Sequence, residues 1–314
     1  MTETDRPLEG STLATETQTR SGFVTLIGAP NAGKSTLVNR LVGTKVSIVT
    51  HKVQTTRALV RGIVTEGQTQ IVLVDTPGIF KPKRRLDRAM VTTAWGGARD
   101  ADQVLILLDA QGGMNEAAEA LLESVEKSYQ NKTLILNKVD RIDPPKLLKL
   151  AQAANEKVKF ENTFMISALT GSGCKDLLDY LVSKMPYGPW YYPEDQISDM
   201  PMRQLAAEVT REKLYLRLHE ELPYSSTVET EKWEERKDGS VRIEQVVYVE
   251  RDSQKKIVLG HKGETIKAIG QSARKEISAI LEQPVHLFLF VKVRDNWGND
   301  PERYREMGLE FPKA

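Results

Sequence analysis

The sequence predicts an α/β unit with a mostly parallel sheet and helices on both faces, followed by a smaller α+β unit. Short apolar runs alternate with helical patterns from about Gly22 to Lys184, which is the chain order of a parallel sheet with crossover helices. The alternation stops at Met185–Pro193, where four residues are proline or glycine. We therefore expect a disordered tail at 1–20, a first domain at 21–186, a linker at 187–199 and a second domain at 200–314.

In the first domain, Phe23–Gly28 is expected to be a strand, and Lys34–Leu41 is expected to open a helix. Two apolar segments, Ala58–Thr65 and Gln68–Asp75, predict a hairpin turned at Glu66-Gly67. The other expected strands are the short apolar runs Gln103–Asp109, Thr133–Asn137 and Thr163–Ser167. The other expected helices are Asn115–Ser128, Pro144–Lys157 and Lys175–Lys184.

The second domain has a different expected order: helix, three strands, helix, strand. These elements are expected at Met202–Leu218, Tyr224–Glu231, Val241–Val249, Lys256–Leu259, Glu264–Leu281 and Val285–Val293. A turn at Asp238-Gly239 is expected to join the first two strands.

The segment Gly28–Ser35 fits the phosphate-binding pattern G-x-x-x-x-G-K-[ST]. Because it lies between an apolar strand and a helix, its backbone N–H groups and the helix N-terminus are expected to surround phosphates. Lys34 is expected to bridge the β- and γ-phosphates, and Ser35 to ligate Mg²⁺. The expected nucleotide contacts are Gly28, Ala29, Pro30, Asn31, Ala32, Gly33, Lys34, Ser35 and Thr36. The alternative is a chance glycine-rich turn.

The tetrapeptide Asn137–Asp140 indicates that the base is guanine. The Asp140 carboxylate can accept hydrogen bonds from the guanine N1–H and exocyclic amine, and adenine offers no such pair. Asn137 is expected to brace the loop, and the stem of Lys138 to cover the base. The segment Ser167-Ala168-Leu169 is expected to place a backbone N–H near the guanine O6.

Two further segments are expected to sense the γ-phosphate. Asp75 is expected to hold Mg²⁺ directly or through a water, and Gly78 to offer its N–H; a plain turn is the alternative. In Gln54-Thr-Thr-Arg57 we expect Thr56 to reach Mg²⁺, and the alternative is two solvated threonines in a loop. The expected metal ligands are therefore Ser35, Thr56 and Asp75.

The residue after Gly78 is Ile79, where many small GTPases carry a glutamine that orients the attacking water. We therefore expect slow Mg²⁺-dependent hydrolysis of GTP to GDP, or another source of positive charge. Asn31 is a candidate for holding a K⁺ ion beside the phosphates; the equally weighted alternative is that it only braces the loop. The residues expected to act in catalysis are Lys34, Thr56, Gly78 and Asn31.

Composition limits the remaining function classes. The net charge is +1, so any nucleic-acid site must be a local patch. The single cysteine, Cys174, excludes an internal disulfide and fits a reducing cytoplasm. No apolar run approaches the roughly 20 residues of a membrane span, and the start of the chain lacks the pattern of a secretory signal.

In the second domain, Gly260-His261-Lys262-Gly263 fits the GXXG loop of a KH module, which clamps single-stranded nucleic acid. Lys262 and the nearby Lys267 would supply positive charge. An ordinary turn at a helix start is the alternative. RNA is favoured over DNA because the chain lacks a recognisable duplex-reading element.

These motifs together resemble the Era family of bacterial ribosome-assembly GTPases, in which a P-loop GTPase domain precedes a type II KH domain. The resemblance runs from about Ser21 to Pro312 and rests on the motifs above and on Tyr192-Pro-Glu-Asp195 in the linker. It implies binding near the 3′ end of 16S ribosomal RNA, a role in maturing the small (30S) ribosomal subunit and peripheral membrane association. We expect a monomer. The tail is longer than is usual in the family.

Two other functions remain open at this point. One is a GTP-regulated RNA-binding module with negligible turnover, which Ile79 favours. The other is a GTPase that modifies tRNA or serves membrane transport, although neither a catalytic cysteine with partners nor a membrane span is visible.

Overall fold

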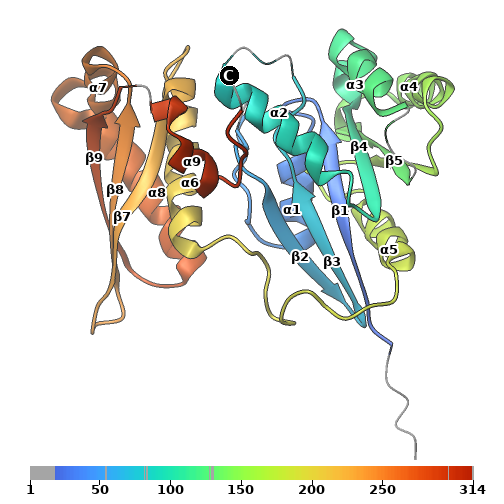
Figure 1. Ribbon diagram of the computed structural model, residues 1–314, viewed down its shortest axis with the longest axis horizontal. Coiled ribbons are helices and arrows are strands. Elements are labelled where there is room, and N and C mark those ends of the chain that lie inside the picture. Colours follow the sequence, from blue (N-terminus) through green and yellow to red (C-terminus); the bar gives the residue numbers. More distant parts are fainter. Residues whose placement is uncertain are drawn as a thin grey trace, which may run out of the picture.

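The computed structural model describes residues 18–312, with the exception of 54, 81, 83, 127, 129, 130 and 296. Two units lie side by side, and an extended segment connects them (Figure 1). Most of the tail expected at 1–20 lies outside the described residues, and its end, Arg20, already belongs to the first strand.

The first unit contains a six-stranded sheet in the order β2-β3-β1-β4-β5-β6. All neighbouring strands are parallel except β2 and β3, which form the expected hairpin. The strands are β1 Arg20–Gly28, β2 Val60–Glu66, β3 Thr69–Asp75, β4 Gln103–Asp109, β5 Lys132–Asn137 and β6 Asn162–Ile166. Because β1, β3, β5 and β6 run in the same direction, the four predicted nucleotide motifs follow strand ends at one edge of the sheet.

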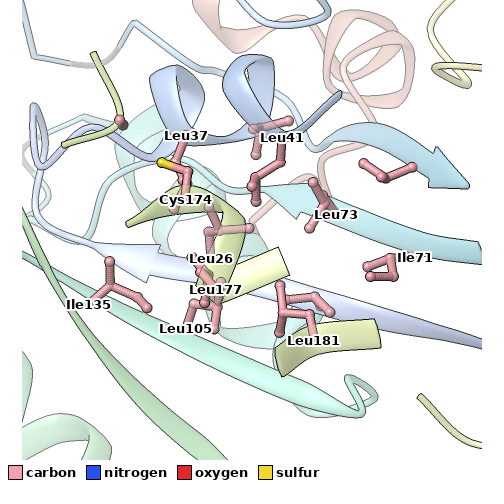
Figure 2. Close-up of a cluster of buried hydrophobic side chains, with 14 of the residues drawn as sticks. Leu26, Leu37, Leu41, Ile71, Leu73, Leu105, Ile135, Cys174, Leu177 and Leu181 are labelled. Atoms are coloured by element: carbon pink, nitrogen blue, oxygen red, sulfur yellow. The ribbon is translucent and has the colours of Figure 1, made fainter. Parts of the chain in front are cut away.

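Helices cover both faces of this sheet, as predicted. On one face α1 (Lys34–Val42) and α5 (Cys174–Lys184) pack against strand residues such as Leu26 and Leu105 (Figure 2). On the other face α3 (Glu116–Glu126) and α4 (Pro144–Lys157) enclose a second core. Consecutive strand residues, such as Leu26 and Ile27, therefore enter opposite cores.

One helix of the first unit was not expected. Helix α2 (Arg85–Gly97) begins where the Asp87 carboxylate accepts a hydrogen bond from the Arg84 backbone N–H at 2.9 Å. Its buried Leu86 and Met90 pack against Trp297 and other residues near the end of the chain. The apolar face of α2 is thus covered by a segment about two hundred positions away in sequence, which no local pattern reveals.

The second unit has a three-stranded sheet, β7-β8-β9, with helices α6 and α8 packed on one face. Strand β7 pairs antiparallel with β8, and β9 pairs parallel with β8. The elements are α6 Met202–Arg217, β7 Ser226–Glu235, β8 Val241–Val249, α7 Asp252–Leu259, α8 Glu264–Leu281, β9 Val285–Val293 and α9 Pro301–Glu306. Helix α9 was not expected.

The expected short strand at Lys256–Leu259 is wrong: this segment is the second half of helix α7. The Gln254 side chain accepts hydrogen bonds from the backbone N–H groups of Glu250 and Arg251, which caps the helix start. The unit therefore runs helix, two strands, two helices, strand and a short final helix. A four-residue apolar run is too short to distinguish a strand from a buried helix segment.

The connecting segment is pinned against the first unit. The Gln70 side chain accepts hydrogen bonds from the backbone N–H groups of Tyr191 and Tyr192, and the Tyr191 ring lies 4.7 Å from that of Phe23. Isolated bridges join Tyr187 to Arg20 and Ser198 to Gly62. The backbone of this segment and the ring of Tyr191 thus fix the path between the two units.

Candidate nucleotide and nucleic-acid sites

A cavity of about 460 Å³ lies at the strand ends of the first unit. Its lining includes the predicted metal ligand Thr56 and most of the predicted nucleotide contacts: Pro30, Asn31, Gly33, Lys34, Ser35, Thr36, Gly78, Asn137, Lys138, Asp140, Ser167, Ala168 and Leu169. Gly28, Ala29, Ala32 and Asp75 do not line it. The phosphate motif and the guanine motif, about 100 residues apart in sequence, therefore share one cavity.

The phosphate-binding loop needs glycine at two points. Gly33 has φ +99°, and a Cβ there would lie 2.2 Å from Nδ2 of Asn137. A Cβ on Gly28 would lie 2.8 Å from the carbonyl oxygen of Leu107. A larger residue at either position would push the loop away from its neighbours, so the tight path of the loop depends on both glycines.

Lys34 is held inside this loop. It is 6% exposed, and its Nζ donates hydrogen bonds to the carbonyl oxygens of Gly28 and Ala29, both at 3.1 Å. Burial lowers the pKa of Lys34 to about 8, although the nearby Asp75 carboxylate opposes this effect. A phosphate group placed in the cavity would favour the charged form of the amine.

Four oxygen-bearing side chains meet next to Lys34. Oδ2 of Asp75 accepts hydrogen bonds from Oγ of Ser35 at 2.6 Å and from Oγ of Ser47 at 2.7 Å. The Thr56 hydroxyl lies 3.0 Å from that of Ser35 and 3.5 Å from Oδ2 of Asp75. Asp75 is fully buried, and burial raises its pKa although these hydroxyl groups and Lys34 oppose the shift.

This arrangement fits a Mg²⁺ ion. Oδ1 of Asp75 is buried and lacks a hydrogen-bond partner among the described residues. Hydroxyl and carboxylate oxygens are the ligands that Mg²⁺ prefers, and a cation would also stabilise the ionised carboxylate. Sequence reasoning missed Ser47, because nothing local marks a serine in the loop after α1 as part of this cluster.

The two neighbouring threonines point to different partners. The Thr56 side chain joins the oxygen cluster around Asp75. The Thr55 hydroxyl donates a hydrogen bond to the carbonyl oxygen of Lys52 at 2.7 Å and lies 2.6 Å from the Thr50 hydroxyl. Of the two, Thr56 is therefore the one placed to meet a metal ion beside Ser35.

Asn137 links three parts of the cavity wall. Its Nδ2 donates to the carbonyl oxygen of Ala32 at 2.8 Å, and its Oδ1 accepts from the backbone N–H of Ala168 at 2.9 Å. The residue thus ties the phosphate loop to the predicted guanine O6 loop. Arg40 supports the same loop by donating from Nε to the carbonyl oxygen of Ala168 at 3.1 Å, a role that sequence reasoning missed.

The predicted guanine contacts line the same cavity. A hydrogen bond from Ser167 lowers the pKa of Asp140, so this carboxylate is ionised at neutral pH. Lys138 has φ +68°, and its Nζ forms an ion pair with Oδ2 of Asp109 at 2.7 Å. Leu169 is 61% exposed. Asp140 therefore presents a charged hydrogen-bond acceptor to the cavity that it lines.

The residues around the γ-phosphate position have distinct surroundings. Ile79 packs toward the core that α3 and α4 cover, and its backbone N–H donates to the carbonyl oxygen of Gly28 at 3.0 Å. A Cβ on Gly78 would lie 2.8 Å from the backbone nitrogen of Pro30. Nδ2 of Asn31 donates to the carbonyl oxygen of His51 at 2.8 Å, so Asn31 braces the loop between α1 and β2.

The predicted RNA-binding loop lies between helices α7 and α8. Gly260 has φ +75°, and a Cβ there would lie 2.2 Å from Oγ1 of Thr265. Lys262 has φ +48° and Gly263 has φ +81°. His261, Lys262 and Lys267 are exposed. The loop therefore presents backbone and positive charge to solvent at the start of α8, and its turn depends on Gly260.

Among the described residues, no helix combines the length and apolar character that a membrane crossing requires.

Two family models match the chain. A model described as 50S ribosome-binding GTPase covers residues 23–138, and a KH domain model covers residues 221–298. The chain is 81% identical over 306 residues to GTPase Era of Brucella suis biovar 1 (strain 1330), covering 98% of each protein. It is 72% identical over 313 residues to GTPase Era of Rhizobium meliloti (strain 1021), covering 100% of each.

Solved structures of Era are similar along nearly their whole length. One is an Aquifex aeolicus Era variant bound to GDP·AlF4⁻, with a TM-score of 0.86. The other is Era in complex with MgGDPNP and nucleotides 1506–1542 of 16S ribosomal RNA, with a TM-score of 0.87. Each is 36% identical to this chain, and each match covers 92% of this chain and 99% of the other.

Proposed function

Because the chain belongs to the Era family of GTPases, we propose that it binds GTP with Mg²⁺ in the strand-end cavity and hydrolyses it slowly. The single observation that carries this proposal is the shared cavity, in which the phosphate loop and Asp140 face the same space. Residues 21–186 would form the nucleotide-binding domain, residues 187–199 the linker, and residues 200–314 the RNA-binding domain.

The residues of the cavity divide the chemistry among them. The N–H groups of the loop and the Lys34 amine would hold the phosphates and stabilise negative charge as the terminal phosphate leaves. Ser35, Thr56 and Asp75 would hold a Mg²⁺ ion, which would neutralise negative charge on the phosphates. Gly78 would donate its N–H to the γ-phosphate. Asp140, Asn137 and the Ser167–Leu169 loop would select guanine.

The slow rate follows from the environment of Ile79. Its apolar side chain packs toward the core and offers no group that could orient an attacking water. A K⁺ ion beside Asn31 would supply positive charge in place of an arginine. Turnover that is the same in K⁺ and Na⁺ would remove this part of the proposal and leave Asn31 with the bracing contact to His51.

The second part of the proposal is that the Gly260–Gly263 loop binds single-stranded 16S ribosomal RNA near its 3′ end, in small-subunit maturation. An Era structure bound to nucleotides 1506–1542 of 16S RNA supports this target. The model described as 50S ribosome-binding covers only residues 23–138, and so it does not include the predicted RNA loop. The family resemblance extends the proposal to a cytoplasmic monomer that associates peripherally with a membrane.

Calorimetry on the full chain tests the nucleotide part directly. In the presence of Mg²⁺, GTP should bind and ATP should not, because adenine leaves the Asp140 carboxylate without its hydrogen-bond donors. Equal affinity for both nucleotides, or no binding of either, would overturn the proposal.

Multiple-turnover phosphate release then separates a slow GTPase from a binding module that never turns over. Crosslinking to cellular RNA in the GTP and GDP states tests the RNA target.

A further inference from the structure

The loop between α1 and β2, which carries Thr56, is fastened to the second unit. The backbone N–H of Val49 donates to Oε1 of Glu212 at 2.8 Å, and Nζ of Lys45 lies 2.7 Å from Oε2 of the same residue. Nζ of Lys52 donates to the carbonyl oxygen of Leu218. Three points of one nucleotide-site loop are therefore held by α6 and by the residue after it.

Arg57 makes the deepest of these contacts. It is 4% exposed, and its guanidinium donates to the carbonyl oxygen of Ser226 at 2.9 Å, to that of Pro223 at 3.3 Å and to the Tyr215 hydroxyl at 2.8 Å. It also lies 5.6 Å from the ring centre of Tyr215 and 5.4 Å from that of Trp297. We call Tyr215, Pro223, Ser226 and Trp297 the arginine socket.

A second arginine, which belongs to the second unit, holds Thr55, the residue before Thr56. Arg211 of helix α6 is 1% exposed, and its Nη2 donates to the carbonyl oxygen of Thr55 at 2.6 Å. The Arg211 guanidinium is itself held by an ion pair with Glu208. The second unit thus fixes the residue before Thr56 through its backbone and the residue after it through its side chain.

Packing alone does not explain a buried arginine at position 57. Taking a guanidinium out of water is costly, and among the described residues no carboxylate forms an ion pair with Arg57. What the guanidinium supplies is a planar fork that fixes direction as well as distance, which an aliphatic side chain cannot do. That property is useful where the neighbouring residue must be held at one position.

We infer that Arg57 is a positioning residue, which, together with the arginine socket, holds the Thr56 hydroxyl where Mg²⁺ is bound. The second unit thereby completes the nucleotide site of the first. This inference rests on the proposed GTP function. It assigns Arg57 no contact with nucleotide or metal, so loss of Arg57 should affect the Mg²⁺-dependent part of nucleotide binding and spare the part that the phosphate loop and Asp140 provide.

The test uses the full chain and N-methylanthraniloyl-GTP, whose fluorescence reports binding. For Arg57→Ala, affinity in EDTA should change by less than about twofold, while the Mg²⁺ concentration needed for half-maximal tightening should rise at least about tenfold. The matched control is Arg84→Ala, which also removes contacts to the second unit, at Glu221 and Tyr224, but from outside the Thr56 loop. This control should leave both quantities unchanged.

If Arg57→Ala does not fold, a variant of its partner Tyr215 in the second unit still tests the inference. Tyr215→Phe keeps the ring and removes the hydroxyl that accepts from Arg57 and also interacts with Arg211. Because both arginines hold residues next to Thr56, this variant should raise the Mg²⁺ requirement in the same direction by about threefold. The inference is overturned if neither variant raises the Mg²⁺ requirement, or if affinity in EDTA falls equally. Failure of the unaltered chain to bind the analogue would instead refute the proposed GTP function.

Discussion

Lys34 and Asp75 are oppositely charged side chains that burial pushes toward their neutral forms. Burial lowers the pKa of Lys34 and raises that of Asp75, although each residue's charge favours ionisation of the other. A nucleotide with Mg²⁺ would bring negative charge to the lysine and positive charge to the carboxylate. The site is therefore electrostatically complementary to its expected ligands at the level of single residues.

The pKa of Lys34 predicts proton uptake on GTP binding. Above pH 8 the amine is mainly neutral in the free protein, and bound phosphates should raise its pKa and protonate it. At about pH 8.5, binding should therefore take up a fraction of one proton and weaken as the pH rises. At about pH 6.5 the amine is already charged, and this uptake should vanish. Calorimetry in two buffers that differ in ionisation enthalpy measures it.

Lys34→Arg is the matched control, because arginine stays charged across this range and takes up no proton from position 34. Any proton that the guanine base gains or loses on binding contributes equally to the proton uptake measured for both proteins. If the unaltered chain and this variant take up the same number of protons at about pH 8.5, the assignment of the titration to Lys34 is wrong.

Asp140 supports a second residue-level prediction. Asp140→Asn should lower GTP affinity at least about a hundredfold, because the amide cannot accept both hydrogen bonds from guanine. It should favour xanthosine triphosphate, whose base carries an acceptor in place of the exocyclic amine. Competition binding with both nucleotides measures this change. An unaltered preference for GTP would contradict the assigned role of Asp140.

At the residue scale, a motif that carries its own spacing can be recognised from sequence alone, and the roles assigned to its residues stay predictions. The phosphate loop and the guanine tetrapeptide are recognisable without neighbours, and both line the cavity. Ser47 and Arg40 were missed because their roles depend on folding: Ser47 donates to Asp75, and Arg40 supports the loop after β6. Single serine and arginine residues carry no spacing signal.

At the scale of elements, a helix or strand was predicted correctly where the residue pattern that specifies it lies within the element and its flanking turns. Helix α8 and strand β9 match their expected bounds, since each has a strong periodic pattern ended by turn residues. Helix α2 was missed because the partners of its apolar face lie near the chain end. Helix α7 was taken for a strand because its short apolar run fits either structure.

The turn between α7 and α8 gives the prediction at this scale. Gly260→Ala would place a Cβ 2.2 Å from Oγ1 of Thr265, on a backbone with positive φ, and should distort the predicted RNA loop. Affinity for a short single-stranded RNA from the 3′ end of 16S RNA should fall at least about tenfold. Fluorescence anisotropy measures RNA affinity, and nucleotide affinity should not change.

Gly239→Ala is the control for backbone strain. Gly239 also has positive φ, at +78°, but lies in the hairpin turn after β7 with nothing within 4 Å of the added Cβ. This variant should cost about 1 kcal/mol of stability and leave RNA affinity intact. Equal loss of RNA binding in both variants would show that general destabilisation, and not the shape of the Gly260–Gly263 loop, is responsible.

At the scale of the whole molecule, contacts connect the nucleotide-site loop to helix α8, which starts at the predicted RNA loop. Glu276 of α8 forms ion pairs with Lys45 of the first unit and with Lys213 of α6. Burial works to raise the pKa of Glu276, but hydrogen bonds from Lys213 and Lys45 outweigh it and hold the pKa below its usual value. The bridge is thus charged at neutral pH.

This bridge predicts that nucleotide and RNA affinities depend on each other. If GDPNP in place of GDP changes RNA affinity by some factor, RNA must change the ratio of GDPNP to GDP affinity by the same factor.

Glu276→Gln should bring that factor toward one, because the neutral amide no longer pairs with Lys45. The affinity for RNA without nucleotide and the affinity for each nucleotide without RNA should stay within about twofold, since Glu276 is absent from the cavity lining. Glu282→Gln, an exposed change just after α8, should leave the factor unaltered. Four dissociation constants per variant, measured by anisotropy and competition, close the cycle. An unchanged factor in Glu276→Gln would show that the Glu276 bridge does not carry the coupling.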